Sequence, residues 1–292
     1  MNKNHGRDPT LFSYLVEGAP VRIEELRRQL AALEPTIAGE CDALLALGNP
    51  VIDGALGGGL GLGALHEIAA ARETDVAAAS GFALALAARM ASRVALTTLG
   101  NSWDARNDAS ACASAVLWIA EDLSLAENGA LYGPALDGIG IAPERLITVA
   151  AARGRDVLWA MEEALRCRAV DMVIGEMRPR GIDQVATRRL ALAAAAGNAL
   201  GLILYTTADD VPSAAVTRWS IGAACDAAPR DTERCHGIGP PRFLARLLRN
   251  RRGPLGTWIV EWNSVEQRFE LATHSEPMAG AAFDRSHRSA VA

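Results

Sequence analysis

Between residues 115 and 206 the sequence alternates short apolar runs with longer segments of helical periodicity. Uninterrupted apolar runs are typical of strands that are buried on both faces of a parallel sheet. We predict such strands at Ala115–Ala120, Leu146–Ala150, Val170–Gly175 and Leu200–Thr206. Because the segments between them suit helices, the pattern predicts an α/β fold with a mostly parallel central sheet flanked by helices.

The connecting segments predict helices at Glu127–Ile139, Arg155–Arg168 and Asp183–Ala196. The uncharged run Leu190–Ala208 is long enough to span a bilayer. Its middle, however, contains Gly197, Asn198 and Gly201, which indicate a helix end, a turn and a strand. We therefore expect no membrane span.

Before this region, a glycine-dense segment at residues 47–65 leads into an expected strand at Leu65–Ala69. A loop follows, and the nearly uncharged stretch Val76–Ala95 predicts a buried helix, with Val94–Thr98 compatible with a strand. After Pro212 we expect a strand at Ala214–Ala223.

Phe243–Leu248 and Thr257–Trp262 flank the turn sequence NRRGPLG and predict a C-terminal β-hairpin, although Phe243–Leu248 also fits a helix. We divide the chain into an N-terminal arm (residues 1–42), a core domain (43–263) and a flexible tail (264–292). The arm contains an amphipathic helix at Val21–Glu34 that packs either on its own domain or on another subunit. Its apolar face consists of Ile23, Leu26, Leu30 and Leu33.

The 29 basic residues include a single lysine, Lys3, in the polar N-terminal stub. A phosphate-binding lysine, a Schiff-base lysine and a lysine general base are thereby excluded from the core. The net charge of −5 also disfavours nucleic-acid binding by the molecule as a whole. Five scattered cysteines without a CxxC pair and a start without an apolar signal sequence suggest a reduced, cytoplasmic protein. The Cys235–His236 pair lacks further ligands at zinc spacing, so we expect no metal and no cofactor.

A nucleotide-binding P-loop places backbone N–H groups, a lysine and a Ser/Thr between a strand and a helix N-terminus. The corresponding segment here, AAARETDVAAASGF, contains no GxxxxGK[ST] motif. It carries Glu73 and Asp75 instead, whose negative charges would repel a polyphosphate. The sequence therefore predicts that the phosphate cradle is absent.

The stretch LGNPVIDGALGGGLGLGALHEI resembles the segment just before the P-loop in the RecA/RadA recombinase superfamily. Within that superfamily the chain is most similar to the ImuA family of RecA-like inducible mutagenesis proteins. This narrower resemblance rests on VLWIAEDLSLAENGALYGPALDGIGIAPERLITV, DVLWAMEEALRC, TRRLALAAAAGNALGLILY, RFLARLLRNRRGPLGTWIVEW and the helix RIEELRRQLAALE. The recombinase motif itself is carried by Asp53, Gly58, Gly59, Gly63 and Glu67.

The resemblance places the water-activating glutamate of RecA at Glu121 and the Walker B carboxylate at Glu176. Two carboxylates at the ends of adjacent parallel strands would suit a metal-assisted hydrolase. Without a phosphate cradle we interpret them instead as remnants of an ATPase ancestor. ATP hydrolysis is not expected, while weak nucleotide binding stays open.

The densest positive patch consists of Arg242, Arg246, Arg249, Arg251 and Arg252. It can bind nucleic-acid phosphates, bind an acidic partner protein, or form a solvated hairpin rim that pairs with Asp and Glu. The resemblance implies an accessory protein of damage-inducible, error-prone translesion synthesis, with RecA and an ImuB-type polymerase-like protein as partners. A true recombinase and a DNA-binding module remain the alternatives.

Overall fold

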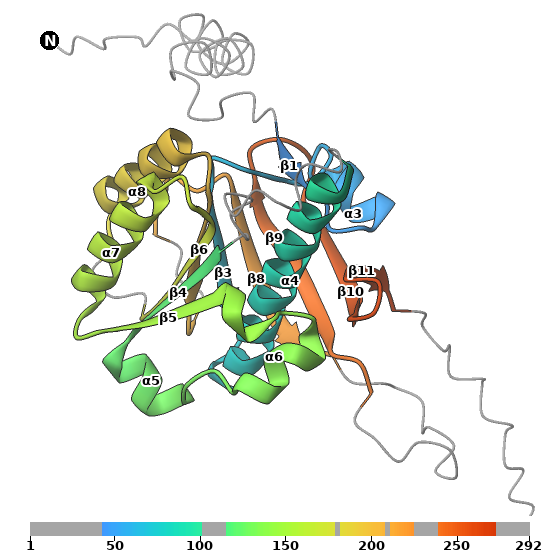
Figure 1. Ribbon diagram of the computed structural model, residues 1–292, viewed down its shortest axis with the longest axis horizontal. Coiled ribbons are helices and arrows are strands. Elements are labelled where there is room, and N and C mark those ends of the chain that lie inside the picture. The colour runs from blue at the N-terminus through green and yellow to red at the C-terminus, as the bar shows by residue number, and fades with distance from the viewer. Residues whose placement is uncertain (1–42, 101–114, 179–181, 208–210, 225–238, 273–292) are drawn as a thin grey trace, which may run out of the picture. The chain divides into compact units, whose positions relative to one another are not determined.

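The computed structural model describes residues 43–100, 115–178, 182–207, 211–224 and 239–272. A nine-stranded sheet with the order β11-β10-β9-β8-β3-β7-β6-β4-β5 runs through this part of the chain (Figure 1). The strands β3 (Leu65–Ala70), β7 (Leu200–Tyr205), β6 (Val170–Met177), β4 (Ala115–Glu121) and β5 (Leu146–Ala151) pair in parallel. The fold is therefore α/β with a mostly parallel central sheet, as predicted, and it is compatible with a RecA-like core.

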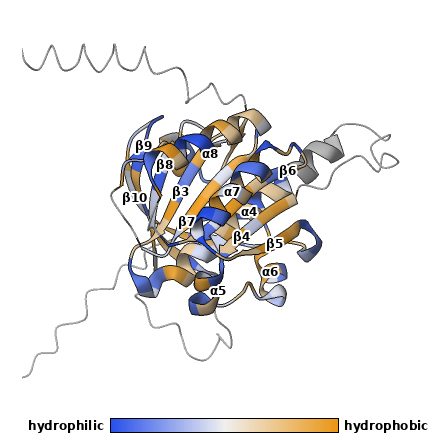
Figure 2. Ribbon diagram, turned by 90° about the vertical axis from the view of Figure 1, so that its left-hand side faces the viewer, coloured by the Kyte–Doolittle hydropathy of each residue, from blue (hydrophilic) through white to orange (hydrophobic). Residues whose placement is uncertain are grey.

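Helices cover the parallel half of the sheet on both faces. The helix α4 (Val76–Gly100) packs on one face, where the largest apolar cluster lies. On the other face α7 (Gly154–Arg166) and α8 (Gln184–Gly197) lie side by side (Figures 1 and 2). The helix α8 ends at Asn198, which adopts a left-handed conformation, and β7 begins two residues later. The turn expected inside the uncharged run 190–208 is thereby confirmed.

The C-terminal strands extend the same sheet in antiparallel fashion. Beside β3, β8 (Thr217–Ala223) is still parallel, whereas β9 (Arg242–Asn250), β10 (Gly256–Asn263) and β11 (Arg268–Leu271) alternate in direction. The expected β-hairpin is confirmed, and residues 243–248 form a strand rather than a helix. The third strand, β11, was not predicted, and it carries the sheet beyond residue 263, where the sequence analysis ended the core domain.

Aromatic side chains join the antiparallel half of the sheet to α4. Phe82 of α4 packs against Trp219, Phe243 and Phe269, with ring centroids 5.9, 5.6 and 4.9 Å away. Trp262 adds an edge-on contact with Phe269 at 5.0 Å. These five rings come from α4 and four different strands, so they hold the C-terminal strands to the N-terminal half of the core.

Two predicted elements were wrong. Residues 94–98 continue α4 instead of forming a strand, because no glycine or proline occurs between Gly81 and Gly100. The single helix expected at Glu127–Ile139 is two helices, α5 (Asp122–Asn128) and α6 (Gly133–Ile139). Gly129, with φ of 80°, ends the first helix, and the Gly-Pro sequence at 133–134 begins the second.

The glycine-dense segment forms the short helix α3 (Pro50–Ala55) and a two-stranded sheet of β1 (Leu44–Leu45) and β2 (Leu60–Gly61). Asp53 accepts hydrogen bonds from the backbone N–H groups of Leu47 and Gly48 at 2.7 and 3.0 Å. Gly59 has φ of 140°, and a Cβ atom there would lie 2.4 Å from the Leu45 carbonyl oxygen. The recombinase-like motif thus builds a compact turn. None of the helices in the described ranges combines the length and apolarity needed to cross a bilayer.

Candidate functional site

The carboxyl ends of the parallel strands form the edge at which open α/β sheets bind ligands. Here β3 runs into the 3-10 helix η1 (Glu73–Asp75) and then directly into α4. This is the position at which a P-loop would cradle phosphate. The geometry of Asp75, Glu73, Glu121 and Glu176 therefore decides what this edge can bind.

Asp75 is buried and accepts hydrogen bonds from the Arg72 side chain and from the backbone of β8. The Arg72 guanidinium donates to both of its carboxylate oxygens, from Nε at 2.8 Å and from Nη2 at 3.2 Å. The backbone N–H of Ala223, at the end of β8, donates to Oδ1 at 3.2 Å. The hydrogen bond from Arg72 lowers the pKa of Asp75, so the carboxylate stays charged. Negative charge thus occupies the position immediately before the α4 N-terminus.

A cleft of about 350 Å³ lies in front of this position, between η1, α5 and the ends of β6 and β7. Its charged lining comprises Glu73, Glu127 and Arg178. Arg178 is paired with Glu127, which is the main reason that the pKa of Arg178 is raised. Because two carboxylates face one guanidinium, the cleft has the wrong charge for a polyphosphate. Val76, Asn128, Thr206 and Thr207 complete the lining.

Glu121 and Glu176 do not converge on a common point. In the parallel register of β4 and β6, Glu176 is the neighbour of Ala120 and not of Glu121. Successive residues of a strand point to opposite faces, so the two carboxylates lie on opposite faces of the sheet. A metal ion held between them is therefore not possible in this arrangement. Across the described segments, no group of three or more His, Cys, Asp and Glu side chains is placed to hold a metal.

Hydrogen bonds engage both carboxylates separately. Glu176 is buried and accepts from Trp118 Nε1 and from Asn128 Nδ2, both at 3.1 Å. Glu121 accepts from the backbone N–H of Gly154 at 3.2 Å, at the start of α7 on the opposite face. Each carboxylate thus fixes a neighbouring element.

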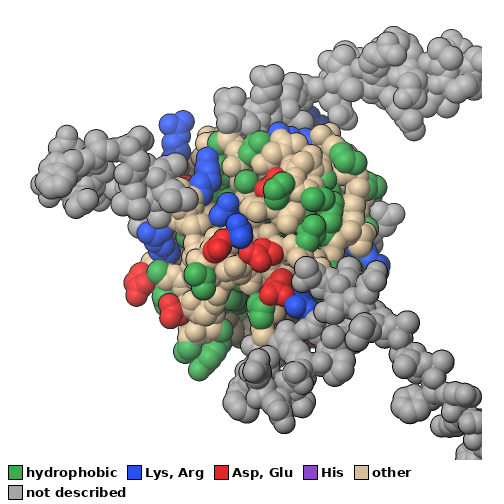
Figure 3. Space-filling view, turned by 90° about the vertical axis from the view of Figure 1, so that its right-hand side faces the viewer, with side chains coloured by type: hydrophobic (Ala, Val, Ile, Leu, Met, Phe, Trp, Pro, Cys, Tyr) green, Lys and Arg blue, Asp and Glu red, His purple; other side chains and the backbone are tan. Residues whose placement is uncertain are grey.

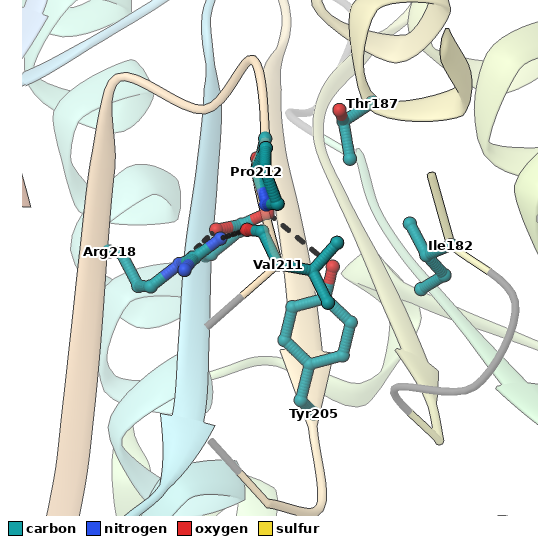
Figure 4. A pocket seen from close by; sticks show the side chains of 8 residues that line it. Ile182, Thr187, Tyr205, Val211, Pro212 and Arg218 are labelled. Atoms are coloured by element: carbon teal, nitrogen blue, oxygen red, sulfur yellow. Dashed lines mark hydrogen bonds and ion pairs between the residues drawn. The ribbon is translucent and has the colours of Figure 1, made fainter. Parts of the chain in front are cut away.

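Glu67, part of the recombinase-like motif, lies at the centre of a buried polar cluster. Arg218 donates from Nε to Glu67 Oε2 at 2.7 Å, and Ser213 Oγ and Tyr205 Oη donate to Oε1. The cavity beside them, about 20 Å³, has room for no more than a water molecule. Figure 4 shows Tyr205 from the end of β7 and Arg218 from β8 on either side of the Val211–Pro212 segment. The cluster holds the β7–β8 connection against the sheet.

Arg218 was missed by the sequence analysis, which assigned no role to it. The available signal was one charged residue inside each of two expected strands, Arg218 in TRWSIGA and Glu67 in LHEIAA. These two strands are neighbours in the sheet. His66, in the strand β3, is a fully buried and hydrogen-bonded core residue. Its ring nitrogens lie 2.8 Å from Thr217 Oγ1 and 3.0 Å from the Gly61 carbonyl oxygen.

Several arginines of the C-terminal cluster form ion pairs or hydrogen bonds with other groups of the same chain. Arg242 forms an ion pair with Glu261, and Arg249 and Arg251 both donate to the Ser213 carbonyl oxygen, at 2.9 and 3.2 Å. Arg246 is exposed on β9, and Arg252 is partly buried. On the side of the molecule where β10 and β11 lie in Figure 1, arginine side chains are interspersed with acidic ones (Figure 3). The cluster is therefore not a continuous cationic surface.

Two sets of residues singled out in the sequence lie outside the described residues. They are the apolar face of the N-terminal helix, with Ile23, Leu26, Leu30 and Leu33, and the Cys235–His236 pair. Their roles stay predictions.

No protein-family model matches the sequence. The chain is, however, 31% identical to the protein ImuA from each of two strains of Caulobacter vibrioides. Each alignment extends over 229 residues, which are 75% of this chain and 83% of the relative. Identity at this level over most of both chains shows common descent, and the chain therefore belongs to the ImuA family.

Proposed function

We propose that the protein is a non-catalytic, RecA-like accessory component of SOS-induced, error-prone translesion DNA synthesis. In this role it acts in the cytoplasm as an adaptor between RecA and a translesion polymerase complex that contains an ImuB-type protein. Membership of the ImuA family supports the general role in DNA damage and mutagenesis. The partners follow from the resemblance described above.

The observation that carries the non-catalytic part is the charge of the cleft at the carboxyl edge of the sheet. Glu73 and Glu127 face Arg178 there, and Asp75 precedes the helix that would otherwise receive phosphate. The α/β framework is present but the phosphate-binding loop is not. The protein therefore serves to bind other molecules and not to catalyse a reaction. We infer that the ancestral ATPase site has been lost.

A fluorescent-nucleotide titration tests this part, with an ATP-binding recombinase as positive control. We expect no saturable binding of ATP or ADP up to millimolar concentration, because the cleft repels polyphosphate. The matched variant Glu73→Gln/Glu127→Gln removes both carboxylates and is expected to bind nucleotide no more weakly than the wild type. Micromolar ATP binding by the wild-type protein would contradict the proposal.

Reconstitution with purified RecA and the ImuB-type protein tests the adaptor part. We expect the full-length chain to retain both proteins, alone or together. Deletion of residues 1–35 is expected to reduce RecA binding if the predicted helix at Val21–Glu34 provides that contact. If the full-length chain binds neither RecA nor the ImuB-type protein, the adaptor role is wrong.

A second candidate function is DNA binding through the C-terminal arginines, and the exposure of Arg246 and Arg251 favours it. The test is a salt series with single-stranded and duplex DNA. Each phosphate contact that is lost should reduce the slope of log affinity against log salt by about 0.7 for single-stranded DNA and by about 0.9 for duplex DNA. An Arg246→Ala/Arg251→Ala variant with unchanged affinity and slope would exclude this patch as the DNA site.

A further inference from the structure

The outer surface of the α7–α8 pair contains a groove that no internal segment of the described chain fills. It measures about 220 Å³ and is lined by Leu158 and Trp159 of α7, by Ala186 and Leu190 of α8, and by charged side chains at its rim. Figure 2 presents the side of the molecule on which these helices lie. Pockets for small molecules measure about 300–1,000 Å³. The smaller groove suits single side chains of a docked protein.

Trp159 is the most unusual residue of this surface, because its side chain is 65% exposed. The buried stripe of α7 consists of Val157, Met161 and Leu165, so Trp159 lies off the face that packs on the sheet. On α8, Val185 and Leu192 are also more than half exposed. Large exposed apolar side chains beside a groove are typical of protein-binding surfaces, and tryptophan is enriched among the residues that dominate binding energy.

The charges at the rim indicate what kind of partner fits. Two guanidinium groups line the groove, those of Arg155 and Arg189, and their side chains are 74% and 62% exposed. The carboxylate in the lining, Glu162, is only 8% exposed and is already paired with both Arg166 and Arg189. Arg155 has only its sequence neighbour Asp156 at 3.4 Å as a described ion-pair partner. The charge accessible to a partner inside the groove is therefore positive.

We propose that this groove is the docking site for an acidic amphipathic segment of a partner protein. An apolar side chain of that segment fills the space beside Trp159 and over Leu158 and Leu190. Its carboxylates pair with Arg155 and with the exposed edge of Arg189. The proposal rests on the proposed adaptor function, to which it adds a surface and the chemistry of the partner.

Nucleic acid is a poorer match for the same surface. The floor of the groove is aliphatic, with Trp159 as the aromatic group, whereas single-strand binders stack successive bases on several aromatic rings. We therefore treat DNA binding here as an outcome of the test.

The experiment measures the affinity of the full-length chain for purified RecA and for the purified ImuB-type protein, each alone. The variants are Trp159→Ala and Arg155→Gln, and the matched control is Tyr132→Ala, which removes another exposed aromatic side chain, 70% exposed. We expect each groove variant to weaken binding of one partner at least tenfold, with an unchanged thermal unfolding midpoint. The control variant should bind as the wild type does. Salt should weaken wild-type binding more than it weakens binding by Arg155→Gln.

Three results would overturn the proposal, and they can be distinguished. Wild-type affinity in Trp159→Ala, when the wild type binds a partner, refutes the groove and leaves the adaptor function intact. Failure of the wild type to bind either protein refutes the adaptor function and the groove together. A loss of single-stranded DNA affinity in Trp159→Ala, with both protein affinities unchanged, assigns the surface to nucleic acid instead.

Discussion

Arg218 donates a hydrogen bond from Nε to the Oε2 atom of Glu67 at 2.7 Å, and the two side chains are 9% and 0% exposed. Glu67 belongs to β3 and Arg218 to β8, which are neighbours in the sheet although 151 residues separate them in the sequence. Ser213 and Tyr205 satisfy the other carboxylate oxygen. The pair therefore joins two parallel strands, of which β8 is the one that pairs antiparallel with β9 on its other side.

Removal of one partner of this pair should be strongly destabilising. Glu67→Ala leaves the guanidinium of Arg218 buried without its carboxylate, and the free energy of unfolding should fall by about 3–5 kcal/mol. The double variant Glu67→Leu/Arg218→Met should lose less than the sum of the single variants. Urea unfolding monitored by circular dichroism measures both. Glu163→Ala, at an exposed ion pair with Arg166, is the control, with an expected cost of about 0.5 kcal/mol or less. An equal cost at both positions would contradict this prediction.

The stability of the protein should decrease between pH 6.5 and pH 4 because of His66. Burial lowers the pKa of this histidine to about 4, so the folded protein keeps it neutral where the unfolded chain, with a pKa near 6.5, binds a proton. The contribution of His66 to the free energy of unfolding is complete above pH 6.5. It falls by up to about 1.4 kcal/mol per pH unit as the pH decreases toward 4. His66→Gln should flatten this dependence, and parallel pH profiles for the two proteins would show that His66 is not responsible.

Truncation of the chain from its C-terminus should lower the unfolding temperature only when β11 is removed. A chain that ends at Ala272 keeps Phe269, which is completely buried against Trp262 and Phe82, and should unfold at the wild-type temperature. A chain that ends at Asn263 loses this ring together with the pairing of β10 and β11. Phe269→Ala alone should cost about 3–5 kcal/mol. Scanning calorimetry compares these three variants with the wild type, and equal midpoints for the two truncated chains would refute a structural role for β11.

Gly59 of the recombinase-like motif and Gly54 of the adjacent helix α3 should respond in opposite ways to substitution by alanine. Gly59→Ala places a Cβ atom against the Leu45 carbonyl oxygen in a left-handed backbone conformation, and we expect a loss of about 2 kcal/mol or more. Gly54 lies within α3 with no atom near the added methyl group, so Gly54→Ala should be neutral or stabilise by about 0.5–1 kcal/mol. Chemical unfolding of the matched pair checks both. A destabilised Gly54→Ala variant would show that α3 needs glycine at this position for another reason.

The sequence alone predicts the parallel strands β4, β5, β6 and β7 to within about two residues. Strand burial and helical periodicity are local properties, so a single segment such as Val170–Gly175 carries enough information to predict its own structure. The same reasoning failed at Val94–Thr98, where β-branched residues suggested a strand that the long helix α4 overrides. It also missed β11, because four residues are too few for a periodic pattern.

The candidate site depended on relationships that no local pattern contains. That the chain lacks a P-loop motif and carries Glu73 and Asp75 in its place is determined by the sequence. Only the register of β4 and β6 decides that Glu121 and Glu176 point to opposite faces, since a shift of one residue would bring both carboxylates to the same face. Only the tertiary structure likewise brings Arg218 to Glu67 and leaves Trp159 on the surface beside Arg155 and Arg189. Strand register and helix packing are set by interactions between distant segments, and these appear only when the chain is folded.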